Sequence, residues 1–224
     1  MAGEGMTAAV HRRQGQPTVA TGWDDGCWRD VPTQPLLHYM GRKPDHFPRT
    51  QVKIAYDATA VWVMFRVDDR YVRALAEKHQ ESVCGDSCVE FFFTPGSDPA
   101  AGYFNLEMNC GGVMLFHYHP AGGEARCEIP ADDCEKIPRA HSLPCRVEPE
   151  ISEPVTWTVA YALPIALLRA YGPVLTPSPG AVWRANFYKC ADNTSHPHWL
   201  TWSPVDYPRP NFHLPHAFGR LVFQ

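Results

Sequence analysis

Hydrophobic and polar side chains alternate along three segments of the chain, as they do on strands that bury only one face. The segments are residues 88–94, 103–109 and 183–189. The polar side of each holds hydrogen-bonding side chains: Glu90; Asn105, Glu107 and Asn109; Arg184, Asn186 and Tyr188. If these strands are neighbours, they predict a polar surface edged by aromatic rings, which suits a neutral polyol such as a sugar. An ordinary solvated sheet face is the alternative interpretation.

The remaining pattern also favours short strands. Residues 51–66 alternate on both sides of a turn, which predicts a hairpin. Residues 164–171 predict a short helix, because proline opens it and Gly172 follows its end. Residues 71–82 fit a short helix or an irregular crossover, and residues 119–150 are expected to be the longest irregular region. About nine or ten short strands with one small helix predict an all-β fold, a β-sandwich.

Length and charge limit the classes of protein that remain. The 224 residues suffice for one domain, which we place at residues 21–224 after a flexible N-terminal segment of residues 1–20. A net charge of −4 gives no electrostatic reason to expect nucleic acid as a partner. No apolar run is long enough for a membrane span, and residues 1–18 lack the apolar stretch of a signal peptide. A cytoplasmic location is therefore favoured, with secretion the alternative if a leader was removed.

Cysteine and histidine spacing leaves metal binding open. The eight cysteines contain no Cys-x-x-Cys pair and are compatible with a reducing or an oxidising compartment. His117 and His119 share one strand face, as metal ligands often do, but no spacing supplies further ligands, which favours surface histidines. Paired aspartates at 68–69 and 132–133 leave a structural calcium ion open, although turns use aspartate routinely.

Aromatic residues and carboxylates give further candidates. Trp62, Trp157 and Trp183 lie in alternating strands and fit a hydrophobic core. Phe212 instead lies in a proline-rich loop, residues 208–215, where a ring is able to stack on a sugar. Glu90 and Glu107 are also candidates for the acid and base of a glycosidase, a hypothesis that depends on their separation.

The ordered motifs resemble carbohydrate-binding module family 9-like proteins, within the wider group of DOMON-like β-sandwiches. The resemblance covers about residues 20–224. The matching segments are the opening Trp23 and Trp28, Val61–Asp69, Asp86–Phe92, Tyr103–Asn109, Trp157–Leu168, Trp183–Tyr188, Trp202–Pro204 and Phe212–Leu221.

The resemblance implies a non-catalytic domain that binds sugar chain ends between two aromatic rings. Matched to the family's motifs, the sugar contacts fall on Glu90, Asn105 or Glu107, Tyr188, Asn211 and Phe212; we add Arg184 from the polar strand face. The ligand would be a monosaccharide or oligosaccharide, in a pathway shared with a glycoside hydrolase, and no cofactor would be required.

One departure from the family pattern concerns the second ring. Val83 or Cys84 stands where the family's other clamp tryptophan is expected, and neither offers the dispersion contacts of a ring. The DOMON group also supplies a second hypothesis, since some of its members bind haem. Met108 and Lys189 are the candidate axial ligands, although Met108 fits a plain core position better.

Overall fold

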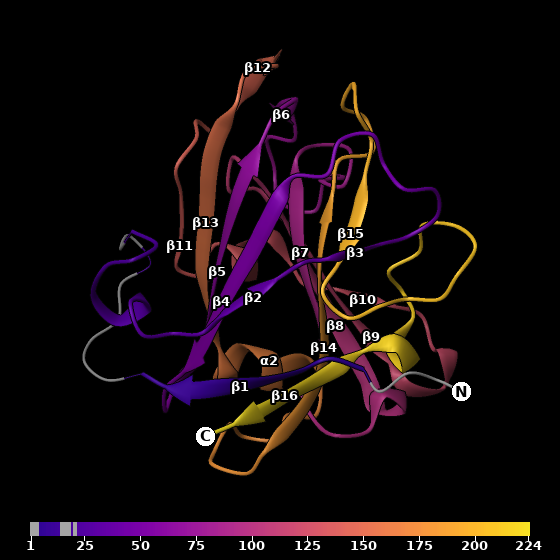
Figure 1. Cartoon of the computed structure of the whole chain (residues 1–224). Coiled ribbons are helices and arrows are strands. Elements are labelled where there is room, and N and C mark those ends of the chain that lie inside the picture. Colours follow the sequence, from indigo (N-terminus) through magenta and orange to yellow (C-terminus); the bar gives the residue numbers. More distant parts are fainter. Residues whose placement is uncertain (1–4, 14–18, 20–21) are drawn as a thin grey trace.

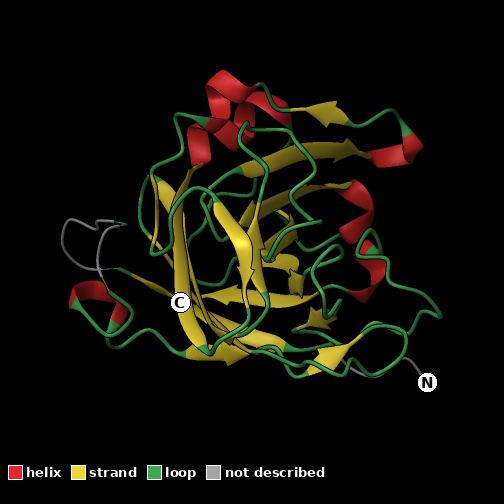
Figure 2. Ribbon diagram, turned by 90° about the horizontal axis from the view of Figure 1, so that it is seen from above, coloured by secondary structure: helices red, strands yellow, loops and turns green. Residues whose placement is uncertain are grey.

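The computed structural model describes residues 5–13, 19 and 22–224. Two layers of strands pack face to face, and the helices lie at their ends (Figures 1 and 2). The all-β sandwich predicted from the alternating segments is therefore confirmed. The described residues form sixteen strands, more than the nine or ten expected, because several strands are only two or three residues long and carry no readable alternation.

The first layer contains the three segments with a polar face. Its strands follow the order β10-β9-β8-β7-β14-β16, while β15 pairs with β14 and β3 pairs with β15. Their bounds are β3 His38–Tyr39, β7 Cys88–Thr94, β8 Gly102–Asn109, β9 Met114–Pro120, β10 Cys127–Glu128, β14 Val182–Cys190, β15 Trp199–Thr201 and β16 Gly219–Phe223.

The second layer follows the order β2-β4-β5-β13-β11, and β6 pairs separately with β12. Its central pair, β4 and β5, is the hairpin predicted at residues 51–66. The bounds are β2 Thr33–Pro35, β4 Arg49–Tyr56, β5 Ala60–Asp69, β6 Val72–Ala74, β11 Arg139–His141, β12 Val147–Ile151 and β13 Val155–Pro164.

Strand β1 (Thr7–Arg12) joins the two layers. It runs parallel to β16 over Thr7–Val10 and then parallel to β4 at His11 and Arg12. The flexible segment expected at residues 1–20 is therefore wrong for β1, because Ala8 and Val10 are buried and their backbone pairs with both layers. The parts of that prediction that fall on residues 1–4, 14–18 and 20 lie outside the described residues.

Helices are few and short. The helix predicted at residues 164–171 is present as α2 (Ile165–Tyr171). A second helix, α1 (Ala131–Cys134), and the short strands β10 to β12 interrupt the region expected to be irregular. The 3-10 turns are η1 Gly26–Trp28, η2 Pro99–Ala101, η3 Ala121–Gly123 and η4 Pro215–Ala217. No helix in the described ranges has the length and apolar character that crossing a bilayer requires.

The main hydrophobic core fills the space between the layers. Phe91, Phe93 and Phe187 project into it from β7 and β14, and the rings of Phe91 and Phe187 stack 4.9 Å apart. Trp157 and Trp183 are fully buried there, which confirms their predicted core role, while Trp62 belongs to a smaller buried cluster with Trp28. Because odd-numbered residues of β7 face this core, Glu90 points to the opposite side of the first layer.

Candidate functional site

The three alternating segments lie side by side as β8, β7 and β14. Glu90 is directly opposite Glu107 on one neighbour and Tyr188 on the other. The expectation that these strands are neighbours is therefore confirmed, and their polar faces form one continuous surface on the outside of the sandwich.

This surface is not an open, solvated sheet face. Glu90, Asn105, Asn186 and Tyr188 are each at most 2% exposed. A second apolar cluster covers the strands, and it combines residues of the sheet with residues of the C-terminal loop, among them Phe92, Tyr188, Phe212 and Phe218. The solvated-face alternative is wrong, because this loop folds back over the strands.

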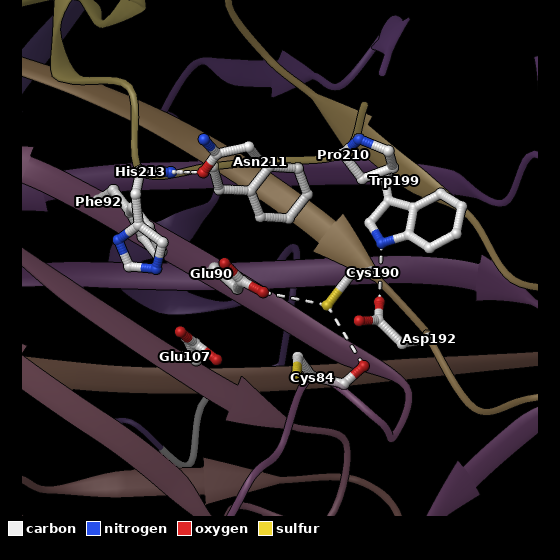
Figure 3. A pocket seen from close by; sticks show the side chains of 11 residues that line it. Cys84, Glu90, Phe92, Glu107, Cys190, Asp192, Trp199, Pro210, Asn211 and His213 are labelled. Atoms are coloured by element: carbon white, nitrogen blue, oxygen red, sulfur yellow. Dashed lines mark hydrogen bonds between the residues drawn. The ribbon is translucent and has the colours of Figure 1, made fainter. Parts of the chain in front are cut away.

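A pocket of about 230 Å³ remains between the covering loop and the sheet. Figure 3 shows Trp199 and His213 on opposite sides, with the carboxylates of Glu90 and Glu107 between them. Pockets that enclose drug-sized ligands measure about 300–1,000 Å³, so this one fits a smaller group. Its lining residues are Cys84, Glu90, Phe92, Glu107, Cys190, Asp192, Trp199, Pro210, Asn211, Phe212 and His213.

Two aromatic rings in the lining are held in place by neighbours. The indole N–H of Trp199 donates a hydrogen bond of 2.8 Å to Asp192. Phe212 stacks on Tyr188 with ring centroids 4.0 Å apart, and the Tyr188 hydroxyl donates to the Phe212 carbonyl at 3.3 Å. Both rings are thus oriented before any ligand arrives, which lowers the entropy cost of binding.

Carboxylates form the polar part of the pocket. Burial, followed by repulsion from Glu107, raises the pKa of Glu90 well above its ordinary value. Burial also raises the pKa of Glu107 to about 7, against the lowering effect of a 3.0 Å hydrogen bond from the Asn105 amide. Burial raises the pKa of Asp192 as well. No lysine or arginine is among the lining residues, so carboxyl groups and the Asn211 amide make up most of the polar lining.

The structure separates the sequence-predicted site residues into two groups. Glu90, Glu107, Asn211 and Phe212 line the pocket. The other three lie elsewhere. Tyr188 stacks against the Phe212 ring. Asn105 donates to Glu107 at 3.0 Å from the same face of β8 and accepts a hydrogen bond of 2.8 Å from His119.

Arg184 is the third residue outside the pocket. Its guanidinium donates to the carbonyls of Phe218 and Gly219, and the residue lines a separate cavity. Arg184, which we expected to assist in sugar contacts, lies further along the strand than the pocket residues: it is opposite Thr94, whereas Tyr188 is opposite Glu90.

Trp199, Asp192 and His213 are lining residues that sequence reasoning missed. Trp199 begins β15, which pairs with the end of β14, and this pairing brings its ring to the pocket. Of the two positions expected to carry the second ring, Cys84 lines the pocket and Val83 is buried in the second apolar cluster. The second ring in the pocket lining is therefore Trp199 of β15, and it does not come from the segment before β7.

The two histidines that share a strand face have other partners. His117 lies 3.9 Å from Glu128, and the His119 ring donates to the Asn105 side-chain oxygen at 2.8 Å. Among the described residues, the group whose side chains approach closely enough to share a metal is Cys88, Glu90 and Cys190. For the haem hypothesis, Met108 is buried in the main core and Lys189 hydrogen-bonds with His198 and the Cys190 carbonyl.

The fold and the pocket define a domain of the β-sandwich class, with an acidic, aromatic-walled pocket on its outer face. A family model described as carbohydrate-binding family 9 matches residues 29–223. The chain belongs to carbohydrate-binding family 9.

Solved structures agree with this assignment. A protein of Bacteroides uniformis ATCC 8492, described as a proposed carbohydrate-binding protein, is 28% identical, with a TM-score of 0.87 over 99% of this chain and 100% of that one. Two family 9 modules of Caldicellulosiruptor kristjanssonii share the fold. The glucose complex is 12% identical, with a TM-score of 0.61 over 97% of this chain and 96% of that one.

The cellotriose complex is 14% identical, with a TM-score of 0.64 over 98% of this chain and 94% of that one. No curated protein matches the chain.

Proposed function

We propose that the chain binds a neutral sugar, as a free hexose or as the end of a short oligosaccharide, in the pocket between Trp199 and Phe212. The observation that carries this proposal is the combination of two oriented rings with three carboxylates and the Asn211 amide in one small pocket. Rings stack on the apolar C–H face of a sugar, and carboxylates accept hydrogen bonds from its hydroxyls.

The family and its solved members support the sugar class. The two Caldicellulosiruptor modules were solved with glucose and with cellotriose, so glucose and cello-oligosaccharides are the first ligands to test. The pocket volume of about 230 Å³ suits one terminal ring better than a buried oligosaccharide. We further propose that a glycoside hydrolase shares the pathway and that the domain itself performs no catalysis.

Each lining group has a defined part in this proposal. Glu90 and Glu107, on the sheet that forms the floor of the pocket, accept hydrogen bonds from the sugar hydroxyls. The Asn211 oxygen already accepts from the backbone N–H of His213 at 3.0 Å, which leaves its amide N–H groups free to donate to a ring oxygen or hydroxyl. Trp199 supplies the more accessible stacking face, since Phe212 is 9% exposed.

Calorimetric titration with glucose, cellobiose, cellotriose and xylose tests the proposal. We expect Trp199→Ala to weaken binding about 5- to 150-fold, the equivalent of about 1–3 kcal/mol for one stacking ring. Trp23→Ala is the matched control, because Trp23 stacks with Lys53 at the other layer, away from the pocket. The proposal is rejected if wild type and Trp199→Ala bind every sugar with equal affinity, or if wild type binds no sugar at millimolar concentration.

Phe212 needs a milder substitution. Its ring packs against Tyr188 and Phe92, so truncation to alanine leaves a cavity that costs about 3–5 kcal/mol of stability. Phe212→Leu keeps most of the volume and removes the aromatic face. We expect weaker sugar binding with a nearly unchanged thermal midpoint, which separates recognition from folding.

The paired carboxylates keep the glycosidase hypothesis testable. Glu90 and Glu107 lie directly opposite each other on adjacent strands, and both have raised pKa values. Release of aryl alcohol from aryl glycosides, abolished in Glu90→Gln, would support an enzyme. Under our proposal wild type and variant release none. The haem hypothesis is tested by the absorption spectrum of the purified protein, where a Soret band would support it.

A further inference from the structure

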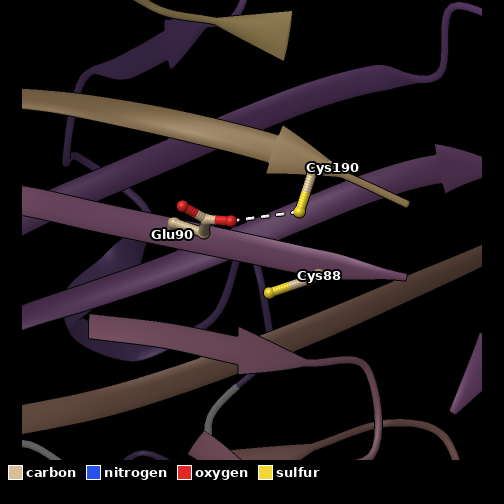
Figure 4. Close-up of side chains that lie close together, drawn as sticks. All are labelled: Cys88, Glu90 and Cys190. Atoms are coloured by element: carbon tan, nitrogen blue, oxygen red, sulfur yellow. Dashed lines mark hydrogen bonds between the residues drawn. The ribbon is translucent and has the colours of Figure 1, made fainter. Parts of the chain in front are cut away.

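Two thiols and one carboxylate meet beneath the floor of the pocket. Cys88 and Glu90 are alternate residues of β7 and point to the same face, and Cys190 of β14 is directly opposite Cys88. The Sγ atoms of the cysteines and a carboxylate oxygen of Glu90 all lie within 4.8 Å of one another (Figure 4). Each residue is at most 2% exposed.

This group of side chains has no ion-pair partner among the described residues. The Cys190 thiol donates to Glu90 Oε1 at 3.0 Å, and the Lys189 charge acts on Glu90 only through space, without an ion pair. Glu107 and Asp192 add two further carboxylates to the same pocket. A buried carboxylate is costly unless it is neutralised by a proton or by a cation.

We propose that Cys88, Cys190 and Glu90 bind a thiophilic divalent ion of the zinc class. On binding, the two thiols and the protonated Glu90 carboxyl each release one proton to solvent and the ion gives up three of its water ligands. Two sulfur–metal bonds form, and one Glu90 oxygen supplies the third bond. The fourth tetrahedral position faces the pocket and takes water. Three protein ligands plus one open position is an arrangement that zinc adopts.

The distances fit this ion with a small adjustment. Zinc bonds of about 2.3 Å to sulfur and 2.0–2.2 Å to oxygen place tetrahedral ligands about 3.5–3.8 Å apart. The present donors, separated by up to 4.8 Å, need to approach by about 1 Å. Side-chain rotation supplies such a shift without movement of the strands. Calcium and magnesium, which prefer six or more oxygen ligands, do not match two sulfur donors.

The pocket provides the route of entry. Cys190 and Glu90 are among its lining residues, and Cys88 lies beside them on the same strand face. The pocket therefore leads to the ligand group from solvent. The proposed ion and the proposed sugar share Glu90, but neither requires the other, so each is tested alone.

The test uses the full chain, reduced and stripped of metal with a chelator, in the absence of sugar. Titration with Cd²⁺, followed by thiolate-to-metal charge-transfer absorption, should reach saturation, and Zn²⁺ should displace the Cd²⁺. We expect Cys88→Ser and Cys190→Ser each to lose most of the absorption and to bind at least tenfold more weakly. Cys127→Ser, which removes an exposed thiol, should match wild type.

Three results would overturn the proposal: an unchanged titration in the Cys88→Ser/Cys190→Ser double variant, an equal loss in Cys127→Ser, or a Cys88–Cys190 disulfide in place of metal binding. Co²⁺ spectra give a second readout, because sulfur ligation in a tetrahedral site has a characteristic visible band. Sugar titration of metal-free Cys88→Ser separates the two proposals, since Cys88 is not a lining residue and sugar affinity should stay at the wild-type value.

Discussion

At the scale of single residues, the orientation of Trp199 depends on one hydrogen bond. Its indole N–H has Asp192 as acceptor at 2.8 Å, and Trp199 is only partly buried. A ring that is free to rotate loses part of its stacking energy to conformational entropy when the ligand binds. If the pocket binds a sugar as proposed, Asp192 therefore affects the affinity partly through Trp199.

The first prediction separates this positioning effect from charge. Asp192→Asn keeps an acceptor for the indole N–H, whereas Asp192→Ala removes it. We expect Asp192→Ala to weaken sugar binding by about 2- to 12-fold, the range of one hydrogen bond, and Asp192→Asn to restore most of that loss. Calorimetric titration measures both. An asparagine variant as weak as the alanine variant would show that the negative charge matters and the orientation does not.

The second prediction concerns the cost of burying Glu107. Its folded pKa is raised from 4.5 to about 7, chiefly by burial, so the unfolded chain ionises first as the pH rises. Folding stability therefore falls as the pH rises from about 4.5 to about 7, and the loss persists at higher pH. Glu107→Gln removes the effect and retains an acceptor for the Asn105 amide.

Denaturant unfolding at pH 5 and pH 7.5 checks this prediction. We expect the stability of Glu107→Gln relative to wild type to rise by about 2 kcal/mol between these two pH values. Asp98→Asn, which removes an exposed carboxylate at the start of η2, is the control variant. A constant difference between wild type and Glu107→Gln would contradict the proposed burial cost.

At the scale of elements, β1 contributes more than its sequence suggests. It pairs with β16 and with β4, so it closes the edge of both layers. Its residues are small or polar, and only Ala8 and Val10 are buried. A strand of this composition is identified only by the strands it pairs with, which are β16 near the C-terminus and β4.

The third prediction is that deletion of residues 1–12 destabilises the domain. The loss of the buried Val10 side chain alone accounts for about 1.5–3 kcal/mol, and the two exposed strand edges add to it. Thermal unfolding should show a clearly lower midpoint and a greater tendency to aggregate. Deletion of residues 1–4, which leaves β1 intact, is the control; equal midpoints for the two deletions would contradict the structural role of β1.

The difference between local alternation and long-range strand pairing explains which parts of the fold and the site the sequence predicted. Alternation in β7, β8 and β14 is local, so the polar face and the residues Glu90 and Glu107 could be inferred directly. Trp199 could not, because its place in the pocket depends on the pairing of β15 with β14 and on the folded-back loop. Arg184 shared the correct face, but alternation does not report distance along a strand.

At the scale of the whole molecule, a buried cluster of charged and polar groups links the two layers. Asp69 at the end of β5 and Lys189 on β14 form an ion pair of 3.7 Å, and neither side chain is more than 1% exposed. Asp69 also contacts His46 at 2.7 Å and accepts from the Trp157 indole at 3.1 Å. This cluster fixes how the two layers meet at one end of the sandwich.

The fourth prediction applies a double-mutant cycle to this ion pair. Lys189→Met leaves Asp69 buried without its cation and should cost about 3–5 kcal/mol. Asp69→Asn in the same chain removes the unpaired charge, so the double variant should be more stable than the sum of the single losses implies. Denaturant unfolding of the four proteins gives the coupling energy, and additive losses would contradict a direct interaction between the layers.

The fifth prediction is that this cluster makes the domain sensitive to acid. Burial, and then the charge of Lys189, lowers the pKa of His198 from 6.5 to about 3. Below pH 6.5 the unfolded chain therefore binds a proton at His198 that the folded chain does not bind. The folding stability falls as the pH falls toward 3. His198→Gln retains an acceptor for the Lys189 ammonium and cannot take up that proton.

Between pH 7 and pH 5, wild type should lose about 2 kcal/mol more stability than His198→Gln. Unfolding in denaturant at the two pH values measures this difference, and His216→Gln, which replaces an exposed histidine in η4, is the control variant. Parallel losses in wild type and His198→Gln would show that the acid sensitivity arises elsewhere in the molecule.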